Sequence, residues 1–233
     1  METIILGSPS TGLGDILLLT SVCKHLLKTS IKVKVELPHS KERFAHLFEG
    51  LAQVELKDEC CITPDIGGGH YATRKLRHFF GNSADNLDNR PLVLYSDPES
   101  ERWVSEYLED KPNPVIFVSA CSKQWDSVRS MPRELADGVL GMLNDAGYTP
   151  ILCSYSENVM ELDCKYQLTD LPLVKYICLL RRVGRYVGCN TGDMHLAVAV
   201  GAKTEVFQPF DHPLFNESEW NYNHPTINYS RFQ

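Results

Sequence analysis

The chain alternates short runs rich in β-branched residues with longer segments of helical period, and this alternation constrains its fold more than any other feature. It is typical of βα units and predicts an α/β protein with mostly parallel sheets. The predicted strands are 3–6, 32–37, 53–56, 62–66, 92–95, 115–119, 149–153, 185–188 and 204–207. The predicted helices are 15–28, 41–49, 71–80, 98–109, 132–146, 171–182 and 194–200. From residue 208 onward no period is clear, so an irregular surface segment is predicted there.

A short polar segment with two prolines, 110–114, separates two series of βα units. It predicts two Rossmann-like domains, an N-terminal one over 1–111 and a C-terminal one over 112–233. The other interpretation, a simple loop within a single sheet, stays open because loops of this length are common.

The charge and apolar content of the chain exclude some classes of protein. A net charge of −7 argues against broad attraction to nucleic acid or anionic membrane, although it allows a local basic patch. No apolar run is long enough for a transmembrane segment, and the N-terminus lacks the positive charge of a signal peptide, so a cytoplasmic protein is expected. The eight cysteines include no C-x-x-C and no zinc-ligand spacing, which predicts reduced core thiols and no metal site.

The loop at 7–15 resembles a phosphate-binding loop in its first glycines only. Gly7 and Gly12 have the spacing of the two P-loop glycines. A P-loop then needs a lysine followed by serine or threonine directly after the second glycine, whereas here Gly12 is followed by Leu13, Gly14 and Asp15. A carboxylate at a helix start repels phosphate. A Rossmann fingerprint also fails, because Leu17 stands where the third glycine belongs. Asp15 is therefore interpreted as an N-cap or first-turn carboxylate, or as a functional acid.

Two strand-to-helix loops in the second half of the chain are candidate anion sites. The turn after the strand at 185–188 exposes backbone N–H groups at a helix start, and Thr191 and His195, four residues apart, face the same side. The other interpretation of His195 is a buried, hydrogen-bonded core residue. The loop after the strand at 115–119 carries hydroxyls and two cations, which suit an anionic ligand but are equally typical of a solvated loop.

The helix at 71–80 carries Arg74, Arg77 and His78 on one face by their spacing. These side chains suit an acidic ligand, either a phosphorylated glycan or a nucleic acid. A solvated basic face is the alternative.

Four segments, taken in order, resemble glycosyltransferase family 9, the ADP-heptose:lipopolysaccharide heptosyltransferases and their relatives. GDI at 14–16 is similar to the family's G-D-[hydrophobic] entry, and DIGGG at 65–69 with the following helix to its D-L-x-G-x-x-R-S. RSMP at 129–132 falls where the family has K-[RH]-W-P, and GCNTGDMH at 188–195 resembles its G-N-D-T-G-x-M-H. The chain resembles a short member.

The resemblance implies a GT-B architecture, with two Rossmann-like domains and a cleft between them. It implies an inverting, metal-independent transfer of a heptose or similar sugar from a nucleotide-sugar, with an ADP-sugar favoured and no other cofactor. Asp15 would be the general base. The donor phosphates and nucleotide would be bound by Ser119, Cys121, Ser122, Arg129, Asn190, Thr191, Gly192 and His195. The acceptor side would include Gly12, Gly14, Arg74 and Arg77.

The chain departs from the family pattern at three of these positions. Asn190 replaces an aspartate, Arg129 replaces a lysine and Met131 replaces a tryptophan. Arg129 keeps the charge and adds planar, bidentate geometry. The departures and the short chain leave a second hypothesis open, a nucleotide-sugar-binding module with weak or no catalysis.

Overall fold

The computed structural model describes residues 3–7, 12–29, 31–68, 70–120, 130–154, 160–209 and 221–232. The chain divides into two compact units. The first unit comprises Met1–Tyr95 with Pro213–Asn223, and the second comprises Ser96–His212 with His224–Gln233. The boundary predicted at 111 lies inside the second unit, in the loop before its first strand. Each unit is described by itself.

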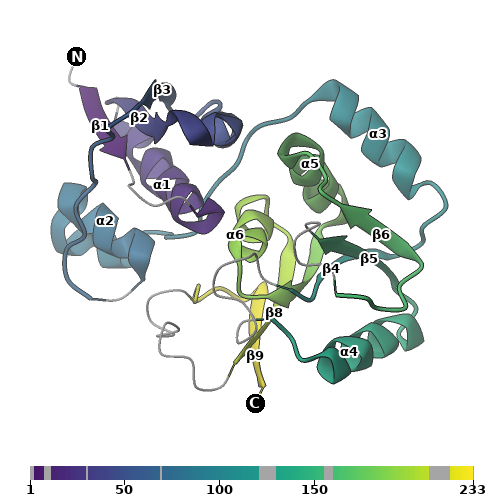
Figure 1. Ribbon diagram of the computed structural model, residues 1–233. Coiled ribbons are helices and arrows are strands. Elements are labelled where there is room, and N and C mark those ends of the chain that lie inside the picture. Colours follow the sequence, from purple (N-terminus) through teal and green to yellow (C-terminus); the bar gives the residue numbers. More distant parts are fainter. Residues whose placement is uncertain are drawn as a thin grey trace. The chain divides into compact units, whose positions relative to one another are not determined.

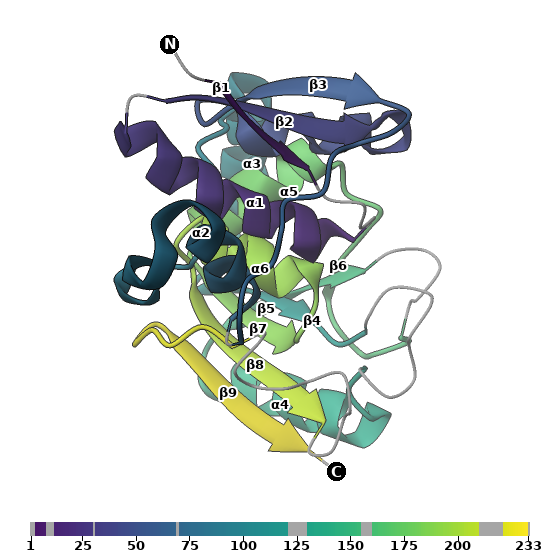
Figure 2. The same cartoon turned by 90° about the vertical axis from the view of Figure 1, so that its left-hand side faces the viewer.

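The first unit contains a parallel three-stranded sheet in the order β1-β2-β3. Its strands are β1 (Thr3–Gly7), β2 (Lys32–Pro38) and β3 (Gln53–Lys57). Its helices are α1 (Leu13–Leu26), α2 (Tyr71–Phe80) and the 3₁₀ segments η1 (Leu27–Thr29), η2 (His39–Phe48) and η3 (Gly81–Asn86). The helix α1 packs against the sheet, and α2 packs against α1 (Figure 2). The predicted helix at 41–49 is thus a 3₁₀ segment.

The prediction of strands at 62–66 and 92–95 in this unit is wrong, because neither segment forms a strand. Thr63 does run beside the end of β1, because its N–H donates to the Gly7 carbonyl at 3.0 Å and its hydroxyl accepts from the Gly7 N–H at 2.9 Å. Pro64 follows and has no N–H, so the ladder stops there. In the other segment, the Leu92 N–H donates to the Thr20 hydroxyl at 3.0 Å, which ties that segment to α1 instead of to a sheet.

The second unit contains a parallel six-stranded sheet in the order β6-β5-β4-β7-β8-β9. Its strands are β4 (Pro114–Val118), β5 (Thr149–Ser154), β6 (Tyr166–Thr169), β7 (Arg185–Cys189), β8 (Lys203–Pro209) and β9 (Ile227–Phe232). Its helices are α3 (Pro98–Leu108), α4 (Arg133–Asp145), α5 (Leu173–Val183) and α6 (Gly192–Ala199). In chain order this is the 3-2-1-4-5-6 arrangement of a Rossmann sheet. The helix α4 covers one face, and α5 and α6 cover the other (Figure 1).

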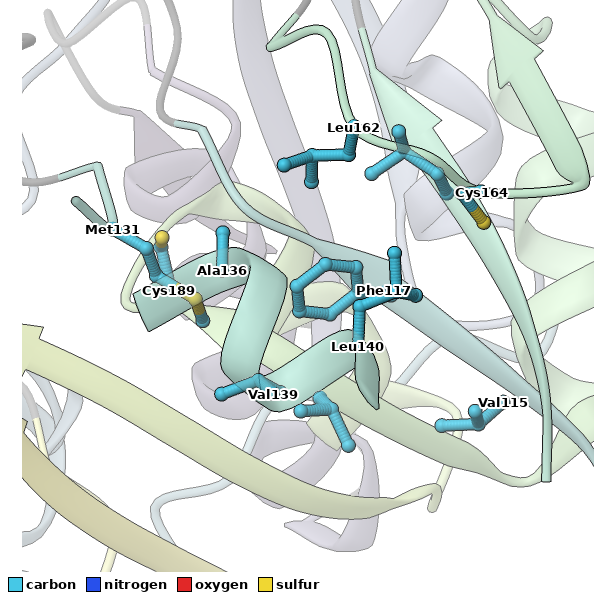
Figure 3. Close-up of a cluster of buried hydrophobic side chains, with 11 residues drawn as sticks. Val115, Phe117, Met131, Ala136, Val139, Leu140, Leu162, Cys164 and Cys189 are labelled. Carbon is cyan, nitrogen blue, oxygen red and sulfur yellow. The ribbon is translucent and has the colours of Figure 1, made fainter. Parts of the chain in front are cut away.

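The core of the second unit centres on Phe117, which is fully buried on β4 (Figure 3). Ala136, Val139 and Leu140 of α4 have the i, i+3, i+4 spacing of one helix face and pack into the same cluster. Val115 points to the same side because side chains alternate along a strand. This packing fixes the strand β4, whose end carries part of the candidate site.

The strand β9 corrects the expectation that everything beyond residue 208 is irregular. It pairs in parallel with β8 along its whole length, from Ile227 opposite Thr204 to Phe232 opposite Pro209. As an edge strand it buries only Ile227 fully, so it lacks the apolar alternation that identifies a strand in sequence. The edge strand β6 was also missed, because its alternation of apolar and polar residues, YQLT, extends over only four positions.

The described ranges carry no signature of a membrane span or of a metal centre. No helix within them is long and apolar enough to cross a bilayer. No group of three His, Cys, Asp or Glu side chains in those ranges is arranged to ligate a metal ion.

Candidate active site

The central pair of strands in the second unit, β4 and β7, forms a topological switch point. The chain leaves β4 towards α4 on one face of the sheet and leaves β7 towards α6 on the other (Figure 1). Between two such crossovers a crevice opens at the carboxyl ends of the strands, which is where open α/β sheets bind ligands. The residues that follow these two strands are Ser119, Asn190 and Thr191, three of the predicted donor-binding residues. We call them, together with Gly192 and His195, the switch-point site.

The two turns of the switch-point site are held side by side by direct contacts. The Cys189 thiol donates to the carbonyl of Ser119, with an Sγ–O distance of 3.2 Å. A Cβ built on Gly188 would lie 2.6 Å from the Val118 carbonyl oxygen, so only glycine allows β7 to approach β4 this closely. The Tyr186 hydroxyl donates to the Cys189 carbonyl at 2.9 Å and fixes the end of β7.

The helix α6 begins at this turn with Thr191 as its N-cap, in an extended conformation. In the part of the chain that the structure describes, no side chain caps this helix start, because the Thr191 hydroxyl donates instead to the Asp193 carboxylate at 3.2 Å. The first helical hydrogen bond runs from the His195 N–H to the Thr191 carbonyl at 3.3 Å. The N–H groups ahead of it carry the positive end of the helix dipole and suit a diphosphate.

Three side chains at this turn are almost completely buried. Asn190 donates through Nδ2 to the Gln208 amide oxygen at 3.1 Å, which anchors it to β8. His195 is only 3% exposed, so an imidazole contact with a ligand requires an approach along the helix start. Asp193 is the third, and sequence reasoning missed it. Burial raises the pKa of its carboxyl, against the opposing effect of hydrogen bonds from Thr191 and Tyr176.

Three predicted donor-binding residues, Cys121, Ser122 and Arg129, lie outside the described residues. The chain is described again from Ser130, and the Met131 N–H donates to the Ser119 carbonyl at 2.9 Å. Met131 is 1% exposed and packs in the core cluster. The position of the family's tryptophan is therefore a core position in this chain.

Asp15 lies in the first turn of α1, in the first unit. The N-cap of α1 is the exposed Gly12, whose carbonyl accepts from the Ile16 N–H at 3.2 Å, and Gly14 is the second residue of the helix. Of the two structural interpretations of Asp15, the first-turn carboxylate is confirmed and the N-cap is wrong. The Asp15 side chain is partly exposed.

The start of α2 brings further polar groups towards Asp15. Burial, with smaller contributions from the carboxylates of Asp65 and Asp15, raises the pKa of the Tyr71 hydroxyl to about 12. Asp65 is 3.0 Å from Lys75 Nζ and 3.9 Å from Arg74 Nη2. We call these five residues the Asp15 cluster.

Lys75 was missed in the sequence, where it reads as part of a solvated basic helix face. It is 1% exposed, and its ammonium donates to the Thr63 carbonyl at 3.0 Å in addition to its ion pair with Asp65. Both of these partners lie in the segment that was predicted to be a strand. No local pattern marks such a lysine as buried.

Arg77, predicted on the acceptor side, is bound within its own unit. Its guanidinium donates to the Ile66 carbonyl at 3.2 Å and to the carbonyl of Gly68. It also donates to Asp85 Oδ1 through Nη2 at 2.6 Å. Arg74 and Arg77 therefore share a helix face as predicted, but each lies in an ion pair with a different carboxylate, while His78 is exposed.

No family model and no curated protein sequence matches the chain. Solved structures do. The E. coli ADP-heptose lipopolysaccharide heptosyltransferase II matches with a TM-score of 0.71 at 11% identity, over 100% of this chain and 91% of that one. A glycosyltransferase family 9 protein from Veillonella parvula DSM 2008 matches with a TM-score of 0.76 at 10% identity, over 99% of this chain and 86% of that one. The E. coli heptosyltransferase WaaC, solved with ADP, matches with a TM-score of 0.60 at 13% identity, over 100% of this chain and 94% of that one.

The resemblance seen in the motifs is thereby confirmed at the level of structure: the chain has the GT-B-like α/β fold of the heptosyltransferases of glycosyltransferase family 9.

Proposed function

We propose that the chain is an inverting, metal-independent glycosyltransferase that moves a heptose or similar sugar from a nucleoside diphosphate to an acceptor hydroxyl. The observation that carries this proposal is the switch-point site. There β7, the strand that pairs with β4, is followed by the start of α6, and the side chain of the N-cap residue Thr191 makes no capping hydrogen bond. That arrangement supplies backbone N–H groups and a helix dipole for a diphosphate. The E. coli heptosyltransferase WaaC, which shares the fold, was solved with ADP, and this favours an ADP-sugar.

The donor would be bound by the second unit. The α6 N–H groups, Thr191, Gly192 and His195 would hold the diphosphate, with Ser119, Asn190, Cys121 and Ser122 around it. Arg129 would add a cation that stabilises the leaving group. Because burial favours the uncharged form of Asp193, its carboxyl opposes the bound anion less than an exposed carboxylate would.

The reaction requires a base for the acceptor proton, and Asp15 is the proposed base. The acceptor oxygen attacks the anomeric carbon on the face opposite the nucleotide, so a new glycosidic bond forms with inversion. The bond to the diphosphate breaks, and its electron pair leaves with the nucleoside diphosphate. The acceptor proton passes to the Asp15 carboxylate. The sequence contains no D-x-D triplet of the kind that holds a metal in other glycosyltransferases.

The acceptor would be bound by the first unit, with Gly12 and Gly14 allowing close approach to Asp15. An acidic glycan of the lipopolysaccharide type is the favoured acceptor, with a nucleic acid as the alternative, because Arg74 and Arg77 lie on one face of α2. The predicted division into a domain over 1–111 for the acceptor and one over 112–233 for the donor remains part of this proposal.

The test is Asp15→Asn, which keeps the shape of the side chain and removes the base. Sugar transfer or donor hydrolysis should fall about 10³-fold, while ADP affinity measured by calorimetry stays within twofold, since general-base catalysis contributes about 10²–10⁴-fold. The matched control is Asp58→Asn, because the Asp58 side chain is 98% exposed. Full activity of Asp15→Asn would refute the assignment of the base.

A nucleotide-sugar-binding module without transfer is the second candidate. It is favoured by one observation, that the guanidinium groups of Arg74 and Arg77 already face Asp65 and Asp85. ADP binding without turnover across a panel of ADP-, UDP-, GDP- and CDP-sugars would support the module. Donor hydrolysis that depends on Asp15 would exclude it.

A further inference from the structure

Thr191 has the side chain and the backbone of a helix cap, but it does not cap α6. Its backbone is extended, as is usual for an N-cap residue, and a threonine at this position commonly accepts a hydrogen bond from the second or third N–H of the helix. Here the hydroxyl makes no such bond, because it donates to Asp193 Oδ2 at 3.2 Å. The hydroxyl is therefore held by a side chain of the helix instead of by the helix backbone.

The other α-helices of the described ranges use the side-chain caps that their sequences offer. His70 accepts from the Ala72 N–H at 3.2 Å at the start of α2, and Asp97 accepts from the Ser100 N–H at 2.8 Å at the start of α3. The N-cap residues of α1, α4 and α5 are glycine or proline, which have no side-chain acceptor. Within those ranges, α6 is thus the α-helix whose N-cap side chain can accept a hydrogen bond and does not.

The Asp193 carboxyl that holds Thr191 lies in the first turn of α6 and is buried, with 9% of the residue exposed. A carboxylate at a helix start interacts favourably with the helix dipole, but at an anion site it also opposes the ligand. Burial adds a cost, because desolvation disfavours the charged form and raises the pKa of this carboxyl. The hydrogen bond with Thr191 is the contact through which the carboxyl acts on the ligand site.

The position of the Thr191 hydroxyl decides which groups at the start of α6 can bind an anion. A hydroxyl turned back to cap the helix would accept from the Met194 N–H, the third of the helix, and would place an acceptor oxygen where a diphosphate oxygen would lie. A ligand would then have to displace this cap. With the hydroxyl held by Asp193, the Met194 N–H remains available together with the positive end of the helix dipole.

We propose that Asp193 is a positioning residue for the nucleotide-sugar: its carboxyl holds the Thr191 hydroxyl away from the start of α6 and keeps the Met194 N–H available to the diphosphate. This inference rests on the proposed function, in which the α6 N–H groups bind that diphosphate. It gives an acidic residue a role in an anion site, because Asp193 acts through Thr191 and not by direct contact with the ligand.

The experiment compares Asp193→Ala with Asp193→Asn in the full chain. Both variants remove the carboxylate and its repulsion of an anion, but only asparagine keeps an oxygen that accepts from the Thr191 hydroxyl. In Asp193→Ala the hydroxyl should cap the helix. ADP, measured by calorimetry, should then bind about fivefold more weakly than to Asp193→Asn, which is the factor expected for an N-cap of ordinary strength. Equal affinities in the two variants would overturn the inference.

Amide hydrogen exchange distinguishes this mechanism from simple damage to the helix. A capping hydroxyl should slow the exchange of the Met194 N–H in Asp193→Ala relative to Asp193→Asn, whereas a loosened helix start would speed it. In the same pair the KM for the nucleotide-sugar should follow the ADP affinity, while kcat stays within about twofold. Faster exchange together with weaker ADP binding in Asp193→Ala would overturn the inference, since a damaged helix would explain both.

The variant Thr191→Val provides the background in which the difference should vanish, because valine has no hydroxyl to cap α6. In this background Asp193→Ala and Asp193→Asn should bind ADP within about twofold of each other, and a persistent fivefold difference would overturn the role of Thr191. The outcomes also separate the inference from the proposed function. A native protein that binds no ADP would refute the donor site, whereas equal exchange of the Met194 N–H in the two variants would refute the role of Asp193 by itself.

Discussion

The polar candidate residues of the second unit are mostly uncharged, whereas those of the first unit, Asp15, Arg74 and Arg77, are charged. At the switch point, Ser119, Asn190 and Thr191 follow strands of a complete Rossmann sheet, and backbone N–H groups supply the polarity. In the first unit, Asp15 lies in the first turn of α1, beside a three-stranded sheet, and Arg74 and Arg77 form ion pairs with Asp65 and Asp85. Fixed backbone dipoles suit the binding of an anion, and ionisable side chains suit proton transfer, so the difference supports the proposal that the second unit binds the donor and the first unit supplies the base.

The two units also differ in the packing of the glycine at the end of a strand, Gly188 in the second unit and Gly7 in the first. Substitution of these glycines is expected to have the largest effect on stability. A Cβ on Gly188 would lie 2.6 Å from Val118 O, between two central strands, and one on Gly7 would lie 2.1 Å from Cys61 O, in a segment outside the sheet. Gly188→Ala should destabilise the second unit by roughly 3 kcal/mol or more, because neither strand can move alone. Gly7→Ala should cost the first unit less, about 1–2 kcal/mol, because a shift of the Cys61 segment strains its hydrogen bonds with Gly7 and Glu36 but breaks no strand pairing.

Urea unfolding followed by amide hydrogen exchange in each unit measures these two costs separately. Gly138→Ala is the control, since a Cβ there meets no atom within 4 Å. A cost at Gly7 equal to or above that at Gly188 would contradict the distinction between a loosely and a tightly packed strand end.

A second prediction concerns pH and only the first unit. His70 is 6% exposed and its pKa is lowered to about 4, first by burial and then by Arg74. Between pH 6.5 and 4 the unfolded chain therefore binds a proton that the folded unit does not, and stability falls as the pH is lowered through this window. The loss should be roughly 2–3 kcal/mol, all of it recovered above pH 6.5.

The variant His70→Asn tests this because asparagine keeps an N-cap acceptor for the Ala72 N–H, which His70 Nδ1 now accepts at 3.2 Å. Its first unit should lose less stability between pH 6.5 and 4 than the native one, as monitored by hydrogen exchange. His39→Asn, at a side chain that is 63% exposed, is the matched control and should keep the native slope. An unchanged slope in His70→Asn would remove His70 from the explanation.

The smallest predicted effect belongs to the second unit. Because burial raises the pKa of Asp193, the folded unit holds a proton above pH 3.8 that the unfolded chain has lost, so stability falls as the pH rises through this range. Asp193→Asn keeps an acceptor for Thr191 and removes that cost. The melting temperature at pH 7 should rise by about 2 °C, which is the scale of less than 1 kcal/mol in a chain of this size. The gain should shrink at pH 4, and Asp137→Asn on the exposed side of α4 should show no such pH dependence.

The parts of the fold that depend on local pattern could be predicted from the sequence. The run at 115–119 is apolar and mostly β-branched, the run at 185–188 carries Tyr186 and Val187, and the two form the neighbouring strands β4 and β7. Their order in the sheet depends on long-range pairing, which no local pattern specifies. The segments 62–66 and 92–95 have strand composition, but Pro64 and the Thr20 hydroxyl take their backbone groups out of any ladder.

The candidate site divides in the same way. The predicted positions of Ser119 and Thr191 follow from their places after β4 and β7, which the structure shows to be adjacent. The burial of Lys75 and Asp193 depends on partners in other elements, Thr63 and Tyr176, so composition alone marks both as ordinary surface charges. The functional roles assigned to the site residues remain predictions that the variants above address.

The first unit is assembled from two separated stretches of chain, and this sets an order of events during synthesis. Tyr222 is 2% exposed and packs on the His70 ring, with centroids 4.6 Å apart, although it lies between β8 and β9 in the sequence. A ribosome must therefore have made almost the whole second unit before the aromatic surface of His70 is covered. A fragment that stops at residue 95 would release the first unit in the same unfinished state, with an uncovered imidazole at the start of α2.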